Sequence, residues 1–196
     1  MTTGVLGGAF DPPHNGHLAL ARAAIERFGL DRLVVVVTGD PPHKAVESGA
    51  ETRFRLAEEA FGDLPGVELS RHELDRTGPS YTVETARWAH GRWGDVVFLI
   101  GADQLADFSG WKEPDEILEH TRLGVATRPG YPRERLDEVL AGLRRPERVE
   151  LFEIPAVDAS STEIRRRVAL GEPIDDLVPP GVARLVVENG LYDELP

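Results

Sequence analysis

The chain has 196 residues, 41% hydrophobic and 29% charged, and no cysteine, which is typical of one globular domain and excludes disulfides and thiolate chemistry. Its formal charge of −12 at pH 7 argues against a nucleic-acid partner, but a small phosphorylated ligand senses mainly the groups near it. The longest apolar run, residues 33–37, is far shorter than the roughly 20 residues of a membrane helix. We therefore expect a cytoplasmic protein with no membrane partner, and we leave its oligomeric state open, a homo-oligomer included.

Strand-like and helix-like segments alternate along the chain. We predict strands at residues 3–6, 33–37, 67–70, 96–100, 122–126 and 149–152. We predict helices at residues 16–28, 51–61, 82–93, 133–143, 163–170 and 181–188. This alternation predicts an α/β fold with a mainly parallel sheet and helices on both faces, in a single domain over residues 1–196. In such sheets a ligand binds at the carboxyl ends of the strands, where the strand order reverses.

A glycine- and histidine-containing segment, residues 7–17, directly follows the first strand. Gly7 and Gly8 let the backbone turn sharply and approach a ligand closely. His14 and His17 are three residues apart, so they project to one side of the first turn if the next helix has begun there. Two imidazoles beside a helix N-terminus favour an anion site. The alternative is a Gly-Pro turn whose histidines only satisfy backbone groups.

The sequence His14-Asn15-Gly16-His17 resembles the His-x-Gly-His signature of the nucleotidylyltransferase superfamily. The resemblance implies a Rossmann-like, doubly wound fold in which both histidines contact nucleotide phosphates. It places Gly7, Gly8, Ala9, Phe10 and Gly16 in the same ATP site. Such a reaction needs in-line positioning and positive charge rather than a general base, because the attacking phosphate oxygen is already ionised. Ala9 stands where relatives often have Ser or Thr, so a hydroxyl contact is absent while the backbone N–H remains.

A second motif, Ser160-Ser161-Thr162-Glu163-Ile164-Arg165, lies near the C-terminus. Ser160 with Glu163 is a capping box that begins a helix. The segment also resembles the Ser-Ser-Thr-x-Ile-Arg signature with which these adenylyltransferases hold the ATP triphosphate. It implies contacts from Ser160, Ser161, Thr162 and Arg165. We expect the following Arg166 and Arg167 to be solvated.

The turn Gly101-Ala102-Asp103 follows the predicted strand at residues 96–100. Asp103 is expected to cap the next helix, and in the family this turn also faces the ribose hydroxyls of adenosine. Gly101 and Asp103 therefore complete the implied ATP site.

Trp111-Lys112 and the upstream Tyr81-Thr82 narrow the resemblance to bacterial nicotinate-mononucleotide adenylyltransferases. In that family a Trp stacks on the pyridine ring, and backbone N–H groups near the positions of Thr82 and Lys112 receive the nicotinate carboxylate. A Trp more often belongs to a core or covers one. Lys44 is a candidate phosphate contact, in a loop that forms either a lid or wall of the mononucleotide site or an exposed loop.

The resemblance covers nearly the whole chain and implies transfer of AMP from ATP to nicotinate mononucleotide, with His14, His17 and Arg165 stabilising charge. Mg²⁺ would be held mainly by the ATP phosphates, and we expect no protein metal site. Nicotinamide mononucleotide, another phosphorylated acceptor, or a non-catalytic nucleotide-binding module remain alternatives. We expect Asp11 to cap its turn, and Arg22, Arg53 and Arg76 to be surface or ion-pair groups.

Overall fold

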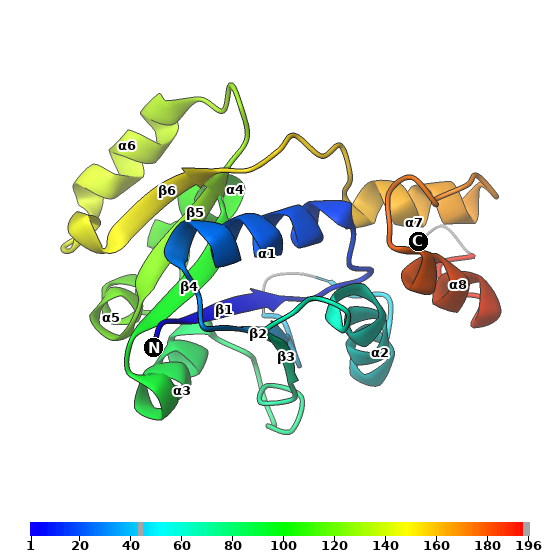
Figure 1. The fold of residues 1–196 in the computed structure, drawn as a ribbon, viewed down its shortest axis with the longest axis horizontal. Helices are drawn as coiled ribbons and strands as arrows, with labels where there is room; N and C mark the ends of the chain where they lie inside the picture. Colours follow the sequence, from blue (N-terminus) through cyan, green and yellow to red (C-terminus); the bar gives the residue numbers. More distant parts are fainter. Residues whose placement is uncertain (43–44, 194–196) are drawn as a thin grey trace.

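A computed structural model describes residues 1–42 and 45–193 (Figure 1). Six strands form one parallel sheet in the order β3-β2-β1-β4-β5-β6. They are β1 (Thr3–Gly8), β2 (Arg32–Val37), β3 (Val67–Ser70), β4 (Val96–Gly101), β5 (Arg122–Thr127) and β6 (Val149–Glu153). The order runs outward from β1 in one direction and from β4 in the other, so the fold is Rossmann-like and doubly wound, as predicted.

Helices cover both faces of the sheet. They are α1 (Asn15–Phe28), α2 (Ala50–Phe61), α3 (Thr82–Trp93), α4 (Ala102–Ala106), α5 (Pro114–His120), α6 (Arg133–Gly142), α7 (Ser161–Ala169) and α8 (Pro180–Glu188). All twelve predicted elements are present, with ends that differ by two residues or fewer. No residue range was predicted for the short α4 and α5, although a helix after Asp103 was expected. No helix within the described residues is long and apolar enough to cross a membrane.

Side-chain alternation along β2 divides the core between the two faces. Leu33, Val35 and Val37 belong to a core that includes α1, α2 and α8. Val34 and Val36 belong to a second core that includes α3, α4, α5 and α6. Every one of these five side chains is buried, as expected for a central parallel strand covered on both faces.

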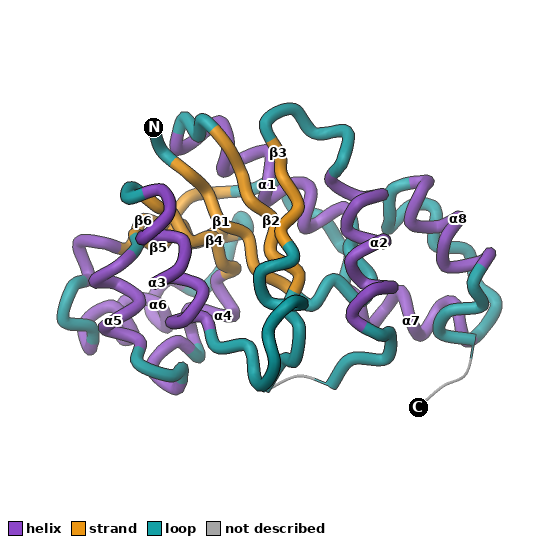
Figure 2. Tube along the Cα trace, turned by 90° about the horizontal axis from the view of Figure 1, so that it is seen from below, coloured by secondary structure: helices purple, strands orange, loops and turns teal. Residues whose placement is uncertain are grey.

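The last helices lie at one end of the molecule. Figures 1 and 2 show α7 and α8 together with α2, away from β5 and β6. Ser161, at the start of α7, donates a hydrogen bond from Oγ to the Pro12 carbonyl oxygen at 2.9 Å. The N-terminal turn of α7 therefore lies against the segment that joins β1 to α1.

Candidate active site

The candidate active site lies at the carboxyl edge of the sheet, where β1 separates from β4. Pairing between β1 and β4 ends at Leu6 and Leu99, whereas pairing between β1 and β2 continues to Gly8 and Val37. The two central strands thus diverge at their carboxyl ends, at the reversal of strand order. This is the position at which doubly wound sheets bind their ligands.

The turn after β1 directs a backbone donor toward this cleft. The Gly8 carbonyl accepts a hydrogen bond from the Thr38 N–H at 2.9 Å, on the β2 side. Because C=O and N–H point in opposite directions across a trans peptide, the Ala9 N–H points away from β2, toward the β4 side. Gly8 is also sterically required, since a Cβ there would lie 2.9 Å from the Phe10 ring.

His14 and His17 lie side by side at the N-terminus of α1. Their ring centroids are 3.8 Å apart, and the His14 backbone N–H donates to Nδ1 of His17 at 3.2 Å. A neutral imidazole that accepts at Nδ1 carries its proton on Nε2, so His17 has a donor at its outer edge. The Phe10 ring packs edge-on against His17 at 5.2 Å and is itself buried, so Phe10 supports the histidine rather than offering its side chain to a ligand.

The N-terminus of α7 lies beside that of α1. Ser160 caps α7 by accepting the Glu163 N–H at 3.1 Å. The capping box is only half formed, because the Glu163 carboxylate pairs with Arg166 and Arg167 instead of returning to Ser160. Thr162 is exposed on the first turn. Two helix N-termini that converge provide N–H groups and positive dipole ends for an anion.

Arg165 extends from α7 to the turn after β1. Its Nη1 donates to the Asp11 carbonyl at 2.8 Å, and its Nε donates to a carboxylate oxygen of Glu47 at 2.6 Å. The guanidinium is therefore fixed near the two helix N-termini. The Asp11 carboxylate accepts from the N–H groups of Glu47 and Ser48, so it caps the loop that leads into α2 rather than its own turn.

A first cavity, the histidine pocket, lies between α1 and the ends of β4 and β5. It contains five of the predicted ATP-site residues: His14, Gly16, His17, Gly101 and Asp103. Its other lining residues are Leu20, Ala102, Gln104, Ala126, Arg128, Tyr131, Ile154 and Val157.

Asp103 does not cap α4, contrary to the expectation. Gly101 is the N-cap residue, and its N–H is satisfied by the side chain of Gln104 at 3.0 Å. Asp103 lies one residue inside the helix, where its carboxylate accepts a hydrogen bond from the Tyr131 hydroxyl at 3.1 Å. Asp103 and Tyr131 both line the histidine pocket.

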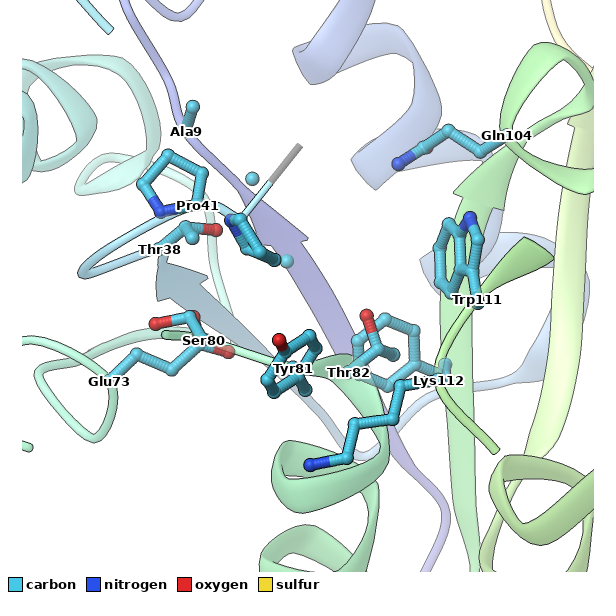
Figure 3. A pocket seen from close by; sticks show the side chains of 14 residues that line it. Ala9, Thr38, Pro41, Glu73, Ser80, Tyr81, Thr82, Gln104, Trp111 and Lys112 are labelled. Atoms are coloured by element: carbon cyan, nitrogen blue, oxygen red, sulfur yellow. The ribbon is translucent and has the colours of Figure 1, made fainter. Parts of the chain in front are cut away.

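A second cavity, the tryptophan pocket, lies beside the β1 turn (Figure 3). It brings together Tyr81, Thr82, Trp111 and Lys112, the four described residues predicted to bind the mononucleotide. Gly7, Gly8 and Ala9 also line it, as do Thr38, Pro41, Pro42, Glu73, Ser80, Phe98 and Gln104. Lys44 lies outside the described residues.

The N-terminus of α3 faces the tryptophan pocket. Its N-cap residue is Tyr81, and within the described residues no side chain caps the helix. An α-helix has no internal acceptor for its first N–H groups, here those of Thr82 and Val83. Lys112 places its Nζ 4.2 Å from the centre of the Tyr81 ring and 3.5 Å from Glu84. Figure 3 shows Trp111 across the pocket from Tyr81, with Thr82 between them in this view.

The two pockets adjoin at Gln104, which lines both of them. Sequence patterns did not identify Gln104, Tyr131 or Glu73 as site residues. Glu73 is buried in the wall of the tryptophan pocket, where Thr85 Oγ1 donates to it at 2.5 Å. Burial raises the pKa of this carboxyl, whereas hydrogen bonds from Thr85, Ser80 and Gly39 act to lower it.

The expectation for Arg53 was wrong. Arg53 is 1% exposed and donates hydrogen bonds to four backbone carbonyls instead of lying on the surface or in an ion pair. A charged residue on the otherwise apolar face of α2, next to Phe54, was the available signal. Arg22 is exposed and Arg76 pairs with Glu84, as expected.

Fold and site together define a Rossmann-like α/β protein with two adjoining pockets at the carboxyl edge of its sheet. Residues 5–167 match the family model described as cytidylyltransferase-like. The chain is 41% identical over 194 residues to a probable nicotinate-nucleotide adenylyltransferase of Thermus thermophilus, covering 98% of this chain and 100% of the relative. It is 38% identical over 197 residues to a protein of the same name from Rubrobacter xylanophilus, covering 98% and 92% of the two chains.

The chain therefore belongs to the nicotinate-nucleotide adenylyltransferases of the cytidylyltransferase-like family. Among solved structures, it resembles the Plasmodium falciparum nicotinic acid mononucleotide adenylyltransferase complexed with NaAD. That match has a TM-score of 0.80 at 17% identity and covers 99% of this chain and 98% of the other. At this identity the likeness shows the shared fold.

Proposed function

We propose that the protein transfers AMP from ATP to nicotinate mononucleotide, a step of NAD biosynthesis that releases nicotinate adenine dinucleotide and pyrophosphate. The observation that carries this proposal is the pair of adjoining pockets that share Gln104 in their walls. One contains the two histidines, and the other places a tryptophan beside an uncapped helix N-terminus. The names of the relatives support the same reaction.

ATP binds with its adenosine in the histidine pocket and its phosphates at the N-termini of α1 and α7. Asp103 accepts hydrogen bonds from the ribose, and Gly101 lies in the wall of the same pocket. Gly7, Gly8, Ala9 and Gly16 allow the backbone close to the phosphates. Ser160, Ser161, Thr162 and Arg165 belong to the triphosphate side, where the phosphates compete with Glu47 for the Arg165 guanidinium.

Nicotinate mononucleotide binds in the tryptophan pocket. Its pyridine ring stacks on Trp111, and its carboxylate accepts from N–H groups at the start of α3, near Thr82. Lys112 adds positive charge to the wall of this pocket, beside the ring of Tyr81. These groups favour a carboxylate over the neutral amide of nicotinamide mononucleotide. On the basis of the sequence alone, we also propose that Lys44 contacts a phosphate.

The chemical step is an in-line displacement at the α-phosphorus of ATP. A 5′-phosphate oxygen of the mononucleotide forms the new P–O bond, while the bond from the α-phosphorus to the bridging oxygen breaks and pyrophosphate leaves with that electron pair. His17 donates from Nε2, and His14 and Arg165 add donors and charge where negative charge accumulates. The acceptor oxygen is already ionised, so the chain supplies no general base.

Mg²⁺ is proposed to enter with ATP. Over residues 1–42 and 45–193, no three His, Asp or Glu side chains are grouped to hold a metal ion. The phosphates and water would therefore supply most of its oxygen ligands, which suits the preference of Mg²⁺ for a retained hydration shell. When bound, the ion neutralises charge on the departing pyrophosphate.

Chromatography of reaction products tests the proposal. With ATP, Mg²⁺ and nicotinate mononucleotide we expect the dinucleotide and pyrophosphate in equal amounts. The Trp111→Ala variant should have a higher KM for the mononucleotide than the wild type. The control is Trp93→Ala, which replaces a half-buried Trp on α3 and should leave this KM unchanged. A melting shift with ATP but no product from any mononucleotide would instead identify a nucleotide-binding module.

A further inference from the structure

Arg53 is a fully buried arginine at the carboxyl edge of the sheet. From α2, its Nε donates to the Ser48 carbonyl at 3.1 Å, and Nη2 donates to the Gly39 carbonyl at 2.9 Å. Its Nη1 donates to the carbonyls of Ala9 at 3.0 Å and Thr38 at 2.6 Å. Four of its five N–H donors thus bind backbone oxygens from three separate segments.

Burying this charge is costly, so the contacts must provide a specific benefit. Burial is the main influence that lowers the pKa of Arg53, and the negative charge of Asp11 opposes it. The four carbonyls belong to residues outside the helices and strands, in the segments after β1, after β2 and before α2, and Arg53 supplies their hydrogen-bond donors. A planar guanidinium binds all four oxygens in one fixed arrangement, which a lysine ammonium with three tetrahedral donors does not reproduce.

The segments that Arg53 joins border the substrate pockets. Ala9 and Thr38 line the tryptophan pocket, and Gly39 begins the loop that contributes Pro41 and Pro42. Because the Ala9 carbonyl is turned toward Arg53, the N–H of the following residue points the opposite way. Gly39 leaves no room for a side chain, since a Cβ there would lie 2.4 Å from the Glu73 carbonyl oxygen.

The same contacts extend to the phosphate side. Ser48 binds Arg53 through its carbonyl and the Asp11 carboxylate through its N–H. The Asp11 carbonyl accepts from Arg165. The turn after β1 is therefore held by one guanidinium at Ala9 and by a second at Asp11.

We propose that Arg53 is a positioning residue that sets the distance and angle between the mononucleotide pocket and the phosphate turn. This inference rests on the proposed function. An in-line attack depends on both substrates being held in register, and misplacement by about 1 Å costs on the order of 100-fold in rate. Arg53 touches neither substrate, so its loss lowers kcat more than it weakens the binding of either one.

The test compares Arg53→Lys with Arg148→Lys, a control in which the arginine donates to the Thr121 carbonyl away from both pockets. Leu136→Ala, in the opposite core, provides a variant with lowered Tm. We expect Arg53→Lys to lower kcat by about 10- to 100-fold with KM values for both substrates within about threefold. If Arg53→Lys and Leu136→Ala lower the Tm equally and also have the same kcat, the proposal is overturned.

Amide hydrogen exchange provides a readout that needs no turnover. We expect the amides of residues 8–11 and 38–40 to exchange faster together in Arg53→Lys, and in neither control. If wild-type protein forms no product, the proposed function fails, while the exchange result still decides whether Arg53 couples the two segments. Unchanged exchange in both segments would contradict the coupling.

Discussion

The two imidazoles at the start of α1 are held in different ways. His17 is oriented by the His14 backbone N–H on Nδ1 and by the Phe10 ring against its side, whereas His14 is the N-cap residue of the helix. A ring fixed on one nitrogen presents the other in a defined direction. In the proposed reaction this makes His17 the better oriented donor to charge that develops in the transition state.

His17→Ala should therefore lower kcat more than it raises the KM for ATP. Loss of one such donor costs roughly 2.7–4 kcal/mol in well-studied oxyanion sites, which corresponds to a 10²- to 10³-fold decrease in kcat. Steady-state kinetics with ATP as the varied substrate measures both constants. Near-normal turnover in the variant would refute the assigned role.

The Glu47→Gln variant should bind ATP more tightly than the wild-type protein. The Glu47 carboxylate lies 2.6 Å from Arg165 Nε and competes with the triphosphate for that guanidinium. Removing its charge should lower the KM for ATP by about two- to fivefold, since partly exposed ion pairs are weak. The exposed control Glu68→Gln should leave the KM unchanged. A higher KM would show that Glu47 mainly orients Arg165.

At the scale of elements, long segments were predictable and short ones were not. The apolar run of β2 and the periodicity of α3 are visible locally. By contrast, α4 has five residues and α5 has seven, too few to display a helical period. The N-cap at Gly101 was missed because a glycine has no side chain to cap the helix, and Gln104 at N3 forms only the returning half of a capping box.

Glu73 couples the loop after β2 to α3, and its buried carboxyl predicts a pH dependence of stability. Its pKa in the folded protein is raised above the ordinary 4.5, mainly by burial. The stability it contributes is therefore complete below the unfolded pKa and is lost as pH rises through the folded pKa. Urea denaturation should show the unfolding free energy of wild type falling relative to Glu73→Gln as pH rises above about 4.5. A difference that is constant with pH would contradict the raised pKa.

At the scale of the whole molecule, the site depends on contacts between distant segments. The Tyr192 hydroxyl donates to the Asp11 carboxylate at 2.6 Å and accepts from Ser48 Oγ at 3.0 Å. Motifs identified the histidines, the tryptophan and Arg165 because those residues lie in short strings. Arg53, Glu73 and Tyr192 escaped prediction because their partners are far away in sequence or are backbone atoms with no residue signature.

Tyr192→Phe should destabilise the protein by about 1–3 kcal/mol, because the buried Asp11 carboxylate loses a donor and the Ser48 hydroxyl loses its acceptor. The free energy of unfolding in urea measures the effect. Tyr131→Phe is the matched control, since that hydroxyl binds the exposed Asp103 and its loss should cost less. Equal stability of the Tyr192→Phe variant and wild type would show that the buried contact contributes nothing to folding.

The central claim is that the tryptophan pocket selects a mononucleotide with a carboxylate for adenylyl transfer. The most direct measurement is kcat/KM for dinucleotide formation with nicotinate mononucleotide and with nicotinamide mononucleotide, at saturating ATP and Mg²⁺. The nicotinate carboxylate is charged and would accept hydrogen bonds from N–H groups at the start of α3. We therefore expect kcat/KM to be about 10- to 100-fold higher for the nicotinate form. An equal or higher value for the amide would contradict the assignment of the acceptor, even if the adenylyl transfer itself were observed.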